Sequence, residues 1–303
     1  MNQWPPEDYR SFIPEFELYT RHLSHPLPPY IRLNPLKAKL RKIMGLLKNE
    51  GVLFETTPID FFFNVKCVQD LGNLLCYYLG YIYPQALASA LPVIALNPKP
   101  GEFVLDMCAA PGGKTTHMAQ LMGDQGTIVA NDRSFGRLTA LSANVKRCGV
   151  TNTVVTQYKG EHFPLGQQFD KILLDAPCSG EGKYRIGPNG RLLFKVAGRT
   201  NLPAIQKGLI IRAFDLLKPG GVLVYSTCTL NPEENEGVVA ALLKKRRACL
   251  KQWNPPLHWN PGLENFRGRI YGRQLSKCRR FYPHHINSVG FFVAYVTKPK
   301  ENG

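Results

Sequence analysis

The stretch that decides the fold is Asp106-Met107-Cys108-Ala109-Ala110-Pro111-Gly112-Gly113-Lys114-Thr115. A short apolar run over residues 103–108 leads into its Pro-Gly-Gly turn, and a helical pattern follows over residues 115–122. In an open α/β sheet, such a strand, glycine turn and helix start form a place where nucleotide-like ligands bind, since glycines allow close backbone approach and the helix offers free N–H groups. The Gly-Gly-Lys-Thr-Thr sequence invites comparison with a P-loop. The first glycine of that motif would fall on Cys108, which excludes it.

Strand-like and helix-like segments alternate from residue 103 onward. The expected strands cover residues 103–108, 127–132, 154–158, 169–175, 222–225 and 290–297. One helix is expected after the glycine turn, one from the cap at Ser134 and one over residues 204–217. A fourth is expected to begin at Asn231-Pro232-Glu233-Glu234. This alternation predicts parallel βαβ units in a doubly wound α/β sheet.

The first hundred residues show a different pattern. We expect a helix over residues 9–22, a strand at 30–33, an amphipathic helix at 36–47 and another strand at 52–56. The predicted organisation is a helical extension over residues 1–28, a small RRM-like α+β unit over 29–80 and a catalytic domain over 81–303. The unit is too small to stand alone, so we expect it to pack against the catalytic domain.

The chain is strongly basic. Its 303 residues hold 38 Lys and Arg against 22 Asp and Glu, a formal net charge of +16. That balance favours a polyanionic partner, with an evenly spread solubility charge as the alternative. Basic residues gather at 37–42, 183–199, 244–251 and 267–280. The last segment is interleaved with aromatic residues, so we expect Arg273, Arg279 and Arg280 to contact RNA.

The sequence also indicates the compartment. Its first residues have neither a basic head nor an apolar core, and no apolar run is long enough to cross a bilayer. Eight cysteines are scattered without a CxxC pair, so we expect mostly reduced thiols and no metal centre. We therefore expect a cytoplasmic, monomeric protein without a membrane partner.

Three polar positions fall at the carboxyl ends of expected strands. Asp132 closes the second strand, where a carboxylate can accept hydrogen bonds from both ribose hydroxyls of an adenosine; a plain turn residue is the alternative. Cys178 in Asp175-Ala176-Pro177-Cys178-Ser179-Gly180 and Cys228 in Ser226-Thr227-Cys228-Thr229 end two others, so both thiols are expected to face the ligand cleft. A thiol must be activated to react at neutral pH, and Lys114 and the helix after Asn231 are possible sources of positive field.

These motifs together carry a resemblance. From Tyr30 to Val296 the chain resembles the Sun/RsmB/RsmF family of RNA (cytosine-5) methyltransferases. The resemblance rests on segments 106–115, 175–180 and 226–235, on Arg280-Phe281-Tyr282-Pro283-His284 before Gly290-Phe291-Phe292, and on Tyr83-Pro84-Gln85 with Ser89. It implies a class I, Rossmann-like methyltransferase fold, S-adenosylmethionine as cofactor and RNA as substrate.

The resemblance also implies roles for individual residues. The thiolate of Cys228 would attack carbon 6 of cytosine, and Cys178 would help remove the carbon-5 proton and release the product. Asp175 would bind the base at N3 and N4, with Lys114 nearby. The cofactor would be held by Asp175, by Arg137 as a candidate by position, and by Cys108, Ala109, Ala110, Pro111, Gly112, Gly113, Lys114 and Asp132.

One departure and several alternatives stay open. The family commonly has an acidic residue after the third strand, where this chain has Lys159, so Glu161 is a substitute. A DNA cytosine-5 enzyme would have little reason for a second thiol at Cys228. A catalytically silent RNA-binding or assembly factor is the alternative from another class, and the intact thiols argue against it. Ribosomal RNA is the first choice of substrate and tRNA the second.

Overall fold

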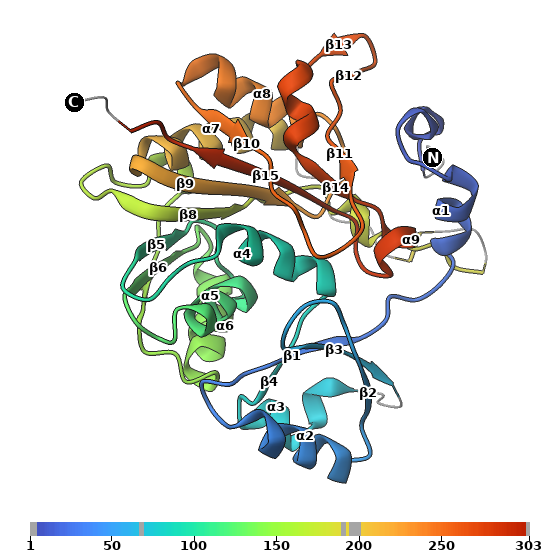
Figure 1. The fold of residues 1–303 in the computed structure, drawn as a ribbon, viewed down its shortest axis with the longest axis vertical. Coiled ribbons are helices and arrows are strands. Elements are labelled where there is room, and N and C mark those ends of the chain that lie inside the picture. Colours follow the sequence, from blue (N-terminus) through green and yellow to red (C-terminus); the bar gives the residue numbers. More distant parts are fainter. Residues whose placement is uncertain (1–4, 67–69, 189–191, 194–200, 301–303) are drawn as a thin grey trace.

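The computed structural model describes residues 5–66, 70–188, 192–193 and 201–300, arranged as Figure 1 shows. These residues form a nine-stranded sheet, a four-stranded sheet and a two-stranded hairpin. Cys67 and, within the basic segment 183–199, residues 189–191 and 194–199 lie outside the described residues. No helix in the described ranges is long and apolar enough to cross a membrane.

Five parallel strands form the centre of the large sheet. Their order is β9-β8-β5-β6-β7, with bounds Leu217–Thr227, Phe169–Asp175, Phe103–Asp106, Thr127–Asn131 and Thr153–Thr156. Because they are parallel, their carboxyl ends meet at one edge, where ligands collect in open α/β sheets. The predicted α/β class and its parallel strands are confirmed.

Antiparallel strands extend the sheet beyond β9. The final strand, β15 (Phe291–Thr297), pairs with β9 from Phe292 to Thr297. Three short strands continue from it: β10 (Cys249–Lys251) and β14 (Arg279–Phe281) pair with β15, and β11 (Asn260–Pro261) pairs with β14. The hairpin β12 (Asn265–Phe266) and β13 (Arg269–Ile270) lies between β11 and β14 in the sequence.

Helices cover both faces of the sheet. Figure 1 shows α7 (Leu202–Asp215) and α8 (Glu236–Lys245) on one side, and α4 (Leu91–Leu96), α5 (Gly113–Leu121) and α6 (Phe135–Arg147) on the other. Alternate residues of β8 serve the two layers, since Leu173 packs with the α4–α6 layer and its neighbours Ile172 and Leu174 pack with α7 and α8. This two-sided burial explains the continuous apolar run of that strand.

The small N-terminal unit has four strands where the sequence indicated two. Its antiparallel order is β2-β3-β1-β4, with bounds Leu53–Thr56, Phe62–Lys66, Tyr30–Leu33 and Ile82–Pro84, and it carries α2 (Leu40–Asn49) and α3 (Leu75–Tyr78). The expected strands β1 and β2 are not neighbours, because β3 lies between them. The sheet also reaches Pro84, past the predicted boundary at residue 80.

Arg32 fastens this small sheet to the glycine turn. Its guanidinium is almost fully buried and donates to the carbonyl of Gly113 at 2.7 Å, to Thr116 Oγ1 at 2.8 Å and to Gln85 Oε1 at 2.9 Å. A buried guanidinium needs such partners, so the contact fixes the small unit beside the turn. The expected packing against the catalytic domain is therefore observed.

The N-terminal extension contains two short helices in place of the single helix expected over residues 9–22. The 3₁₀ helix η1 (Glu7–Ser11) and helix α1 (Phe16–His22) are separated at Pro14. Proline lacks an N–H, and Glu15 has a left-handed φ of 48°, so no helix can run through this point.

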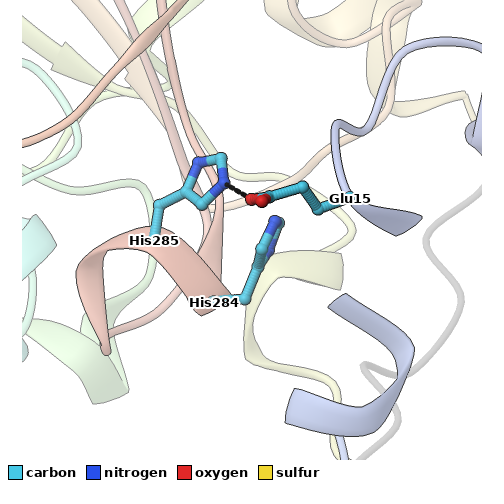
Figure 2. Close-up of side chains that lie close together, drawn as sticks. All are labelled: Glu15, His284 and His285. Carbon is cyan, nitrogen blue, oxygen red and sulfur yellow. Dashed lines mark hydrogen bonds and ion pairs between the residues drawn. The ribbon is translucent and has the colours of Figure 1, made fainter. Parts of the chain in front are cut away.

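Three contacts clamp this extension to α9 (Pro283–Ile286) and the residue before it. Tyr282 donates to the carbonyl of Phe12 at 3.1 Å, and the Nε2 atom of His284 lies 3.0 Å from the carbonyl of Pro14. Figure 2 shows the third, in which the Nε2 atom of His285 lies 2.8 Å from the Glu15 carboxylate. Ligand atoms of Glu15, His284 and His285 lie within 4.8 Å of one another, but both Nε2 atoms already have protein partners. We therefore interpret the group as a clamp.

Candidate active site

A cavity of about 390 Å³ opens at the carboxyl edge of the parallel strands. Its walls come from the ends of β5, β6, β8 and β9 and from α7. The lining residues include Met107, Cys108, Ala110, Asp132, Arg133, Arg137, Gly160, Glu161, Asp175, Cys178, Lys183, Leu209 and Cys228. Residues predicted from separate motifs thus meet in one place.

The glycine turn forms one wall. Gly112 has φ 104° and precedes α5, a backbone conformation that residues with a side chain rarely adopt. A Cβ atom there would also lie 3.0 Å from Leu141. Cys108 and Ala110 face the cavity, whereas Ala109, Pro111, Gly112, Gly113 and Lys114 are not among its lining residues. The first four of these form the turn without lining the cavity, and the side chain of Lys114 contacts Asp175.

Asp132 is buried where β6 ends. One carboxylate oxygen accepts from the backbone N–H of Ala110 at 3.3 Å and the other from that of Ser134 at 3.0 Å. Arg137 lies 3.2 Å from the same carboxylate and also donates to the carbonyl of Ala110. Together, Asp132 and Arg137 fix the position of the turn at the cavity wall.

Glu161 lies after β7, in the 3₁₀ helix η4 (Gly160–His162), and lines the cavity. Leu209 of α7 lines the same region. A Cβ atom at Gly208 would lie 3.2 Å from the Glu161 side chain, so α7 packs closely against it. The acidic substitute expected near the third strand is therefore within reach of a ligand in the cavity.

The two predicted thiols are in direct contact. The Sγ atoms of Cys178 and Cys228 lie 3.4 Å apart. Beside them, Asp175 accepts from Lys114 Nζ at 2.7 Å and from Ser226 Oγ at 2.8 Å. The four residues predicted to be catalytic thus form one cluster at the ends of two adjacent strands, with Lys114 reaching in from α5.

The two thiols have opposite protonation tendencies. The hydrogen bond from Cys178 and the nearby positive charges of Lys183 and Lys114 lower the pKa of Cys228 to about 7. The same hydrogen bond, together with burial, raises the pKa of Cys178 well above its ordinary value. Of the two thiols, Cys228 is therefore the one that loses its proton first, and it begins to ionise near neutral pH.

The Asn231–Asn235 segment supports both thiol loops from behind. Glu234 accepts from the Ser179 backbone N–H at 3.0 Å and from Gln206 Nε2 at 2.9 Å. Asn235 accepts from Thr227 Oγ1 at 2.6 Å and donates to the carbonyl of Thr229 at 3.0 Å. Helix α8 starts only at Glu236, so these residues form a hydrogen-bonded brace and not the helix start expected as a source of positive field.

Lys183 lines the cavity beside the thiols, although the sequence pattern places it only in the basic segment 183–199. The signal available was its place five residues after Cys178. No periodic pattern indicates which way a loop side chain points.

The prediction that Arg279 and Arg280 contact RNA is wrong. Both are buried: Arg280 Nε pairs with Glu236 at 2.7 Å, and Arg279 donates to the carbonyl of Trp253 at 2.8 Å. The interleaved aromatic side chains are also buried, which removes their faces from solvent; they are Phe266, Tyr271, Phe281 and Tyr282. Arg273 is exposed, so only it among the three keeps the predicted role.

Comparison with known proteins gives concordant results. The family model described as 16S rRNA methyltransferase RsmB/F matches residues 93–297. A Pyrococcus abyssi tRNA (cytosine(49)-C(5))-methyltransferase is 40% identical over 296 residues, which is 96% of this chain and 94% of the relative. A human 28S rRNA (cytosine(4447)-C(5))-methyltransferase is 39% identical over 283 residues, 90% of this chain but only 34% of that longer protein.

A solved structure shows the same fold. The structure of NSun6 from Pyrococcus horikoshii with SFG, an S-adenosylmethionine analogue, superposes with a TM-score of 0.83 at 28% identity. It covers 97% of each chain. The similarity therefore extends over the small N-terminal unit as well as the large sheet.

Proposed function

Because the chain belongs to the RsmB/F family of rRNA methyltransferases, we propose that it methylates carbon 5 of a cytosine in RNA through a covalent bond to Cys228. Its enzyme class is RNA (cytosine-C5)-methyltransferase and its cofactor is S-adenosylmethionine. The observation that carries the proposed mechanism is the contact of 3.4 Å between two thiols of which one has a lowered pKa.

Carbon 5 of cytosine is a poor nucleophile, and the thiolate of Cys228 overcomes this. Its Sγ atom bonds to carbon 6, which makes the ring an enamine whose carbon 5 can take the methyl group. S-adenosylmethionine supplies that methyl group when bound. A base must then remove the carbon-5 proton, so that the C5=C6 bond re-forms and the Sγ–C6 bond breaks.

Cys178 is placed to be that base. Its pKa is raised chiefly by the hydrogen bond to Cys228, by burial and by the charge of Cys228. Once Cys228 is bonded to carbon, both contributions from Cys228 disappear and the pKa of Cys178 falls. The second thiol thus becomes able to lose its proton only after the first has formed the adduct.

Asp175 holds the base during attack, and Lys114 holds Asp175. A carboxylate can accept from the exocyclic N4 amino group and stabilise a proton at N3 as the adduct forms. Lys114 and Ser226 fix this carboxylate at 2.7 and 2.8 Å. A cytosine must leave its stack to reach these groups, because they line a cavity at the edge of the sheet.

The part of the cavity that Asp132 and Glu161 line would hold the cofactor. Asp132 is held where it can accept from the ribose hydroxyls, and Glu161 can accept from the adenine side. Cys108, Ala110 and Arg137 line the same cavity. A buried carboxylate facing an open cavity is the chemistry that an adenosine group requires.

The RNA substrate has two candidates. The family description and the human relative name ribosomal RNA. The second candidate is tRNA. It is supported by the archaeal relative, which matches this chain over nearly its whole length and is named for tRNA. We also propose that the protein acts in the cytoplasm as a monomer.

Bisulfite sequencing of total RNA from cells with and without the gene tests the function and identifies the substrate. We expect one or a few cytosines to lose methylation when the gene is removed. Complementation with the wild type should restore them, and complementation with Cys228→Ala should not. If the deletion leaves every methylated cytosine in rRNA and tRNA unchanged, the chain is a silent binding factor.

A further inference from the structure

We propose that Lys183 is the positioning residue that keeps Cys228 ionised, with its ammonium group acting as the counter-charge of the nucleophile. This inference rests on the proposed function, since it assigns a role in activating the same thiol. Lys183 lines the cavity together with Cys178 and Cys228. It acts through Cys228 and need not touch the RNA.

The backbone around Lys183 is fixed against that of Cys228. Lys183 ends the 3₁₀ helix η5 (Glu181–Lys183), and the N–H of Gly182 donates to the carbonyl of Cys228 at 3.0 Å. The carbonyl of Gly182 accepts from the N–H of Gly290 at 2.9 Å. A Cβ atom at Gly182 would lie 2.2 Å from the Gly290 carbonyl oxygen, so only glycine allows this approach. Two hydrogen bonds therefore set the residue next to Lys183 between β9 and β15.

The N-terminal extension supports the same loop from outside. Tyr9 donates to the buried Glu181 at 3.1 Å, and the N–H of Ile186 donates to the carbonyl of Leu23 at 2.9 Å. The Glu15–His285 contact shown in Figure 2 fastens that extension to α9. The loop that carries Lys183 is therefore held by hydrogen bonds to Cys228 and Gly290 on one side and to the N-terminal extension on the other.

The two lysines near the thiols differ in whether a carboxylate neutralises their charge. Lys114 is paired with Asp175 at 2.7 Å, so its field at the thiols is largely cancelled. In the described part of the chain, no carboxylate forms an ion pair with Lys183. Its pKa is raised first by Cys228, and Lys183 in turn contributes more than Lys114 to lowering the pKa of Cys228. The unpaired cation is the one that stabilises the thiolate.

Alkylation of Cys228 by iodoacetamide, followed by mass spectrometry of its peptide across a pH series, tests this role without RNA or turnover. The wild type should show a midpoint near pH 7. Lys183→Met and Lys183→Gln should move the midpoint upward by about one pH unit, giving roughly tenfold less thiolate below it. Lys183→Arg keeps the charge, so its midpoint should lie close to that of the wild type. Lys218→Met, at the far end of β9, should leave the midpoint unchanged.

An unchanged midpoint in both Lys183→Met and Lys183→Gln, with S-adenosylmethionine binding intact to show folding, would overturn the proposal. Equal upward shifts in Lys183→Arg and Lys183→Met would do the same, since a charge effect survives that replacement. The proposed function is checked separately by incubating the wild type with RNA that contains 5-fluorocytidine. Failure to trap RNA on Cys228 would refute the covalent mechanism and leave the alkylation result valid.

Discussion

Cys178 and Cys228 end adjacent parallel strands, and their Sγ atoms lie 3.4 Å apart. This contact makes their ionisation mutually exclusive, because two thiolates at that separation repel strongly in a buried site. When Cys228 is ionised, its thiolate therefore lies beside the neutral thiol of Cys178. The order in which they act follows from which thiol is bonded to carbon.

Replacing Cys178 with Ala should trap the reaction after methyl transfer. Cys228 can still form its bond to carbon 6, but the carbon-5 proton is no longer removed by the second thiol. We expect a band of protein linked to RNA on a denaturing gel, and this band should be absent from the double variant lacking Cys228. Normal turnover in Cys178→Ala without any linked species would assign proton removal to another group.

The single-turnover rate should depend on pH through Cys228. A thiol whose pKa is about 7 is mostly protonated below that pH, so the rate should rise as pH passes through 7 and then level off. In Cys178→Ala the hydrogen bond to the thiolate is lost, so the rising limb of methyl transfer should move to higher pH. A profile that is flat between pH 6 and 8 would show that ionisation of this thiol does not limit the rate.

The sequence predicts the thiol cluster because of strand topology. Cys178 and Cys228 each follow an apolar strand, and parallel strands bring their carboxyl ends to one edge, so proximity follows from the pattern. No comparable rule predicts the direction of the Lys183 side chain, because that direction depends on the hydrogen bonds that hold the loop at Gly182 and Gly290.

A run of basic residues in the sequence does not show whether those residues are exposed or buried. The run that contains Arg279 and Arg280 resembles a nucleic-acid surface, yet the carboxylate of Glu236, 44 residues earlier than Arg280, draws that guanidinium into the core. The helix expected across Pro14 fails because its periodicity continues on both sides of a residue that cannot lie inside a helix. The small sheet has more strands than predicted because β4 has only three residues, whereas the alternating Phe63-Asn64-Val65-Lys66 sequence of β3 is a strand signal that the prediction missed.

Replacing Asp132 with Ala should weaken S-adenosylmethionine binding. The change removes a charged acceptor for two ribose hydroxyls, each hydrogen bond contributing roughly 1.5–3 kcal/mol, so calorimetry should show affinity lower by at least about tenfold. Asp132→Asn keeps the shape and should have an intermediate effect. Asp124→Asn, a carboxylate that bonds the Thr151 backbone away from the cavity, serves as the control. Unchanged affinity in Asp132→Ala would remove this residue from the site.

Replacing Arg280 with Met should destabilise the fold. Arg280 and Glu236 are both buried, and removal of one partner leaves the other charge unpaired, at a cost of about 3–5 kcal/mol. Chemical denaturation should show this loss, with partial recovery in the Arg280→Met, Glu236→Gln double variant. The exposed pair of Arg246 and Asp215 provides the comparison, and Arg246→Met should cost less than about 1 kcal/mol.

Because Arg279 and Arg280 are buried, we expect exposed basic residues of the small N-terminal unit to contact RNA in addition to Arg273. Lys39, Arg41 and Lys42 are exposed at the start of α2, and this unit is fastened to the glycine turn through Arg32. Phosphate contacts release counterions, so RNA affinity should fall linearly with salt on a log–log plot, by about 0.7 per contact for single strands. Neutralising these three residues together should flatten that slope and raise the dissociation constant.

A matched variant separates a local contact from a general charge effect. Lys244, Lys245 and Arg247 are also exposed, but they lie at the C-terminal end of α8, about 15 Å along that helix from its start beside the thiol loops. Removing their three charges lowers the net charge equally and should leave the salt slope nearly unchanged. Filter binding at three salt concentrations measures both variants, with S-adenosylmethionine affinity as the folding control. Equal flattening in the two variants would mean that RNA senses only the overall charge, and a slope unaffected by the α2 change would exclude α2 as the contact.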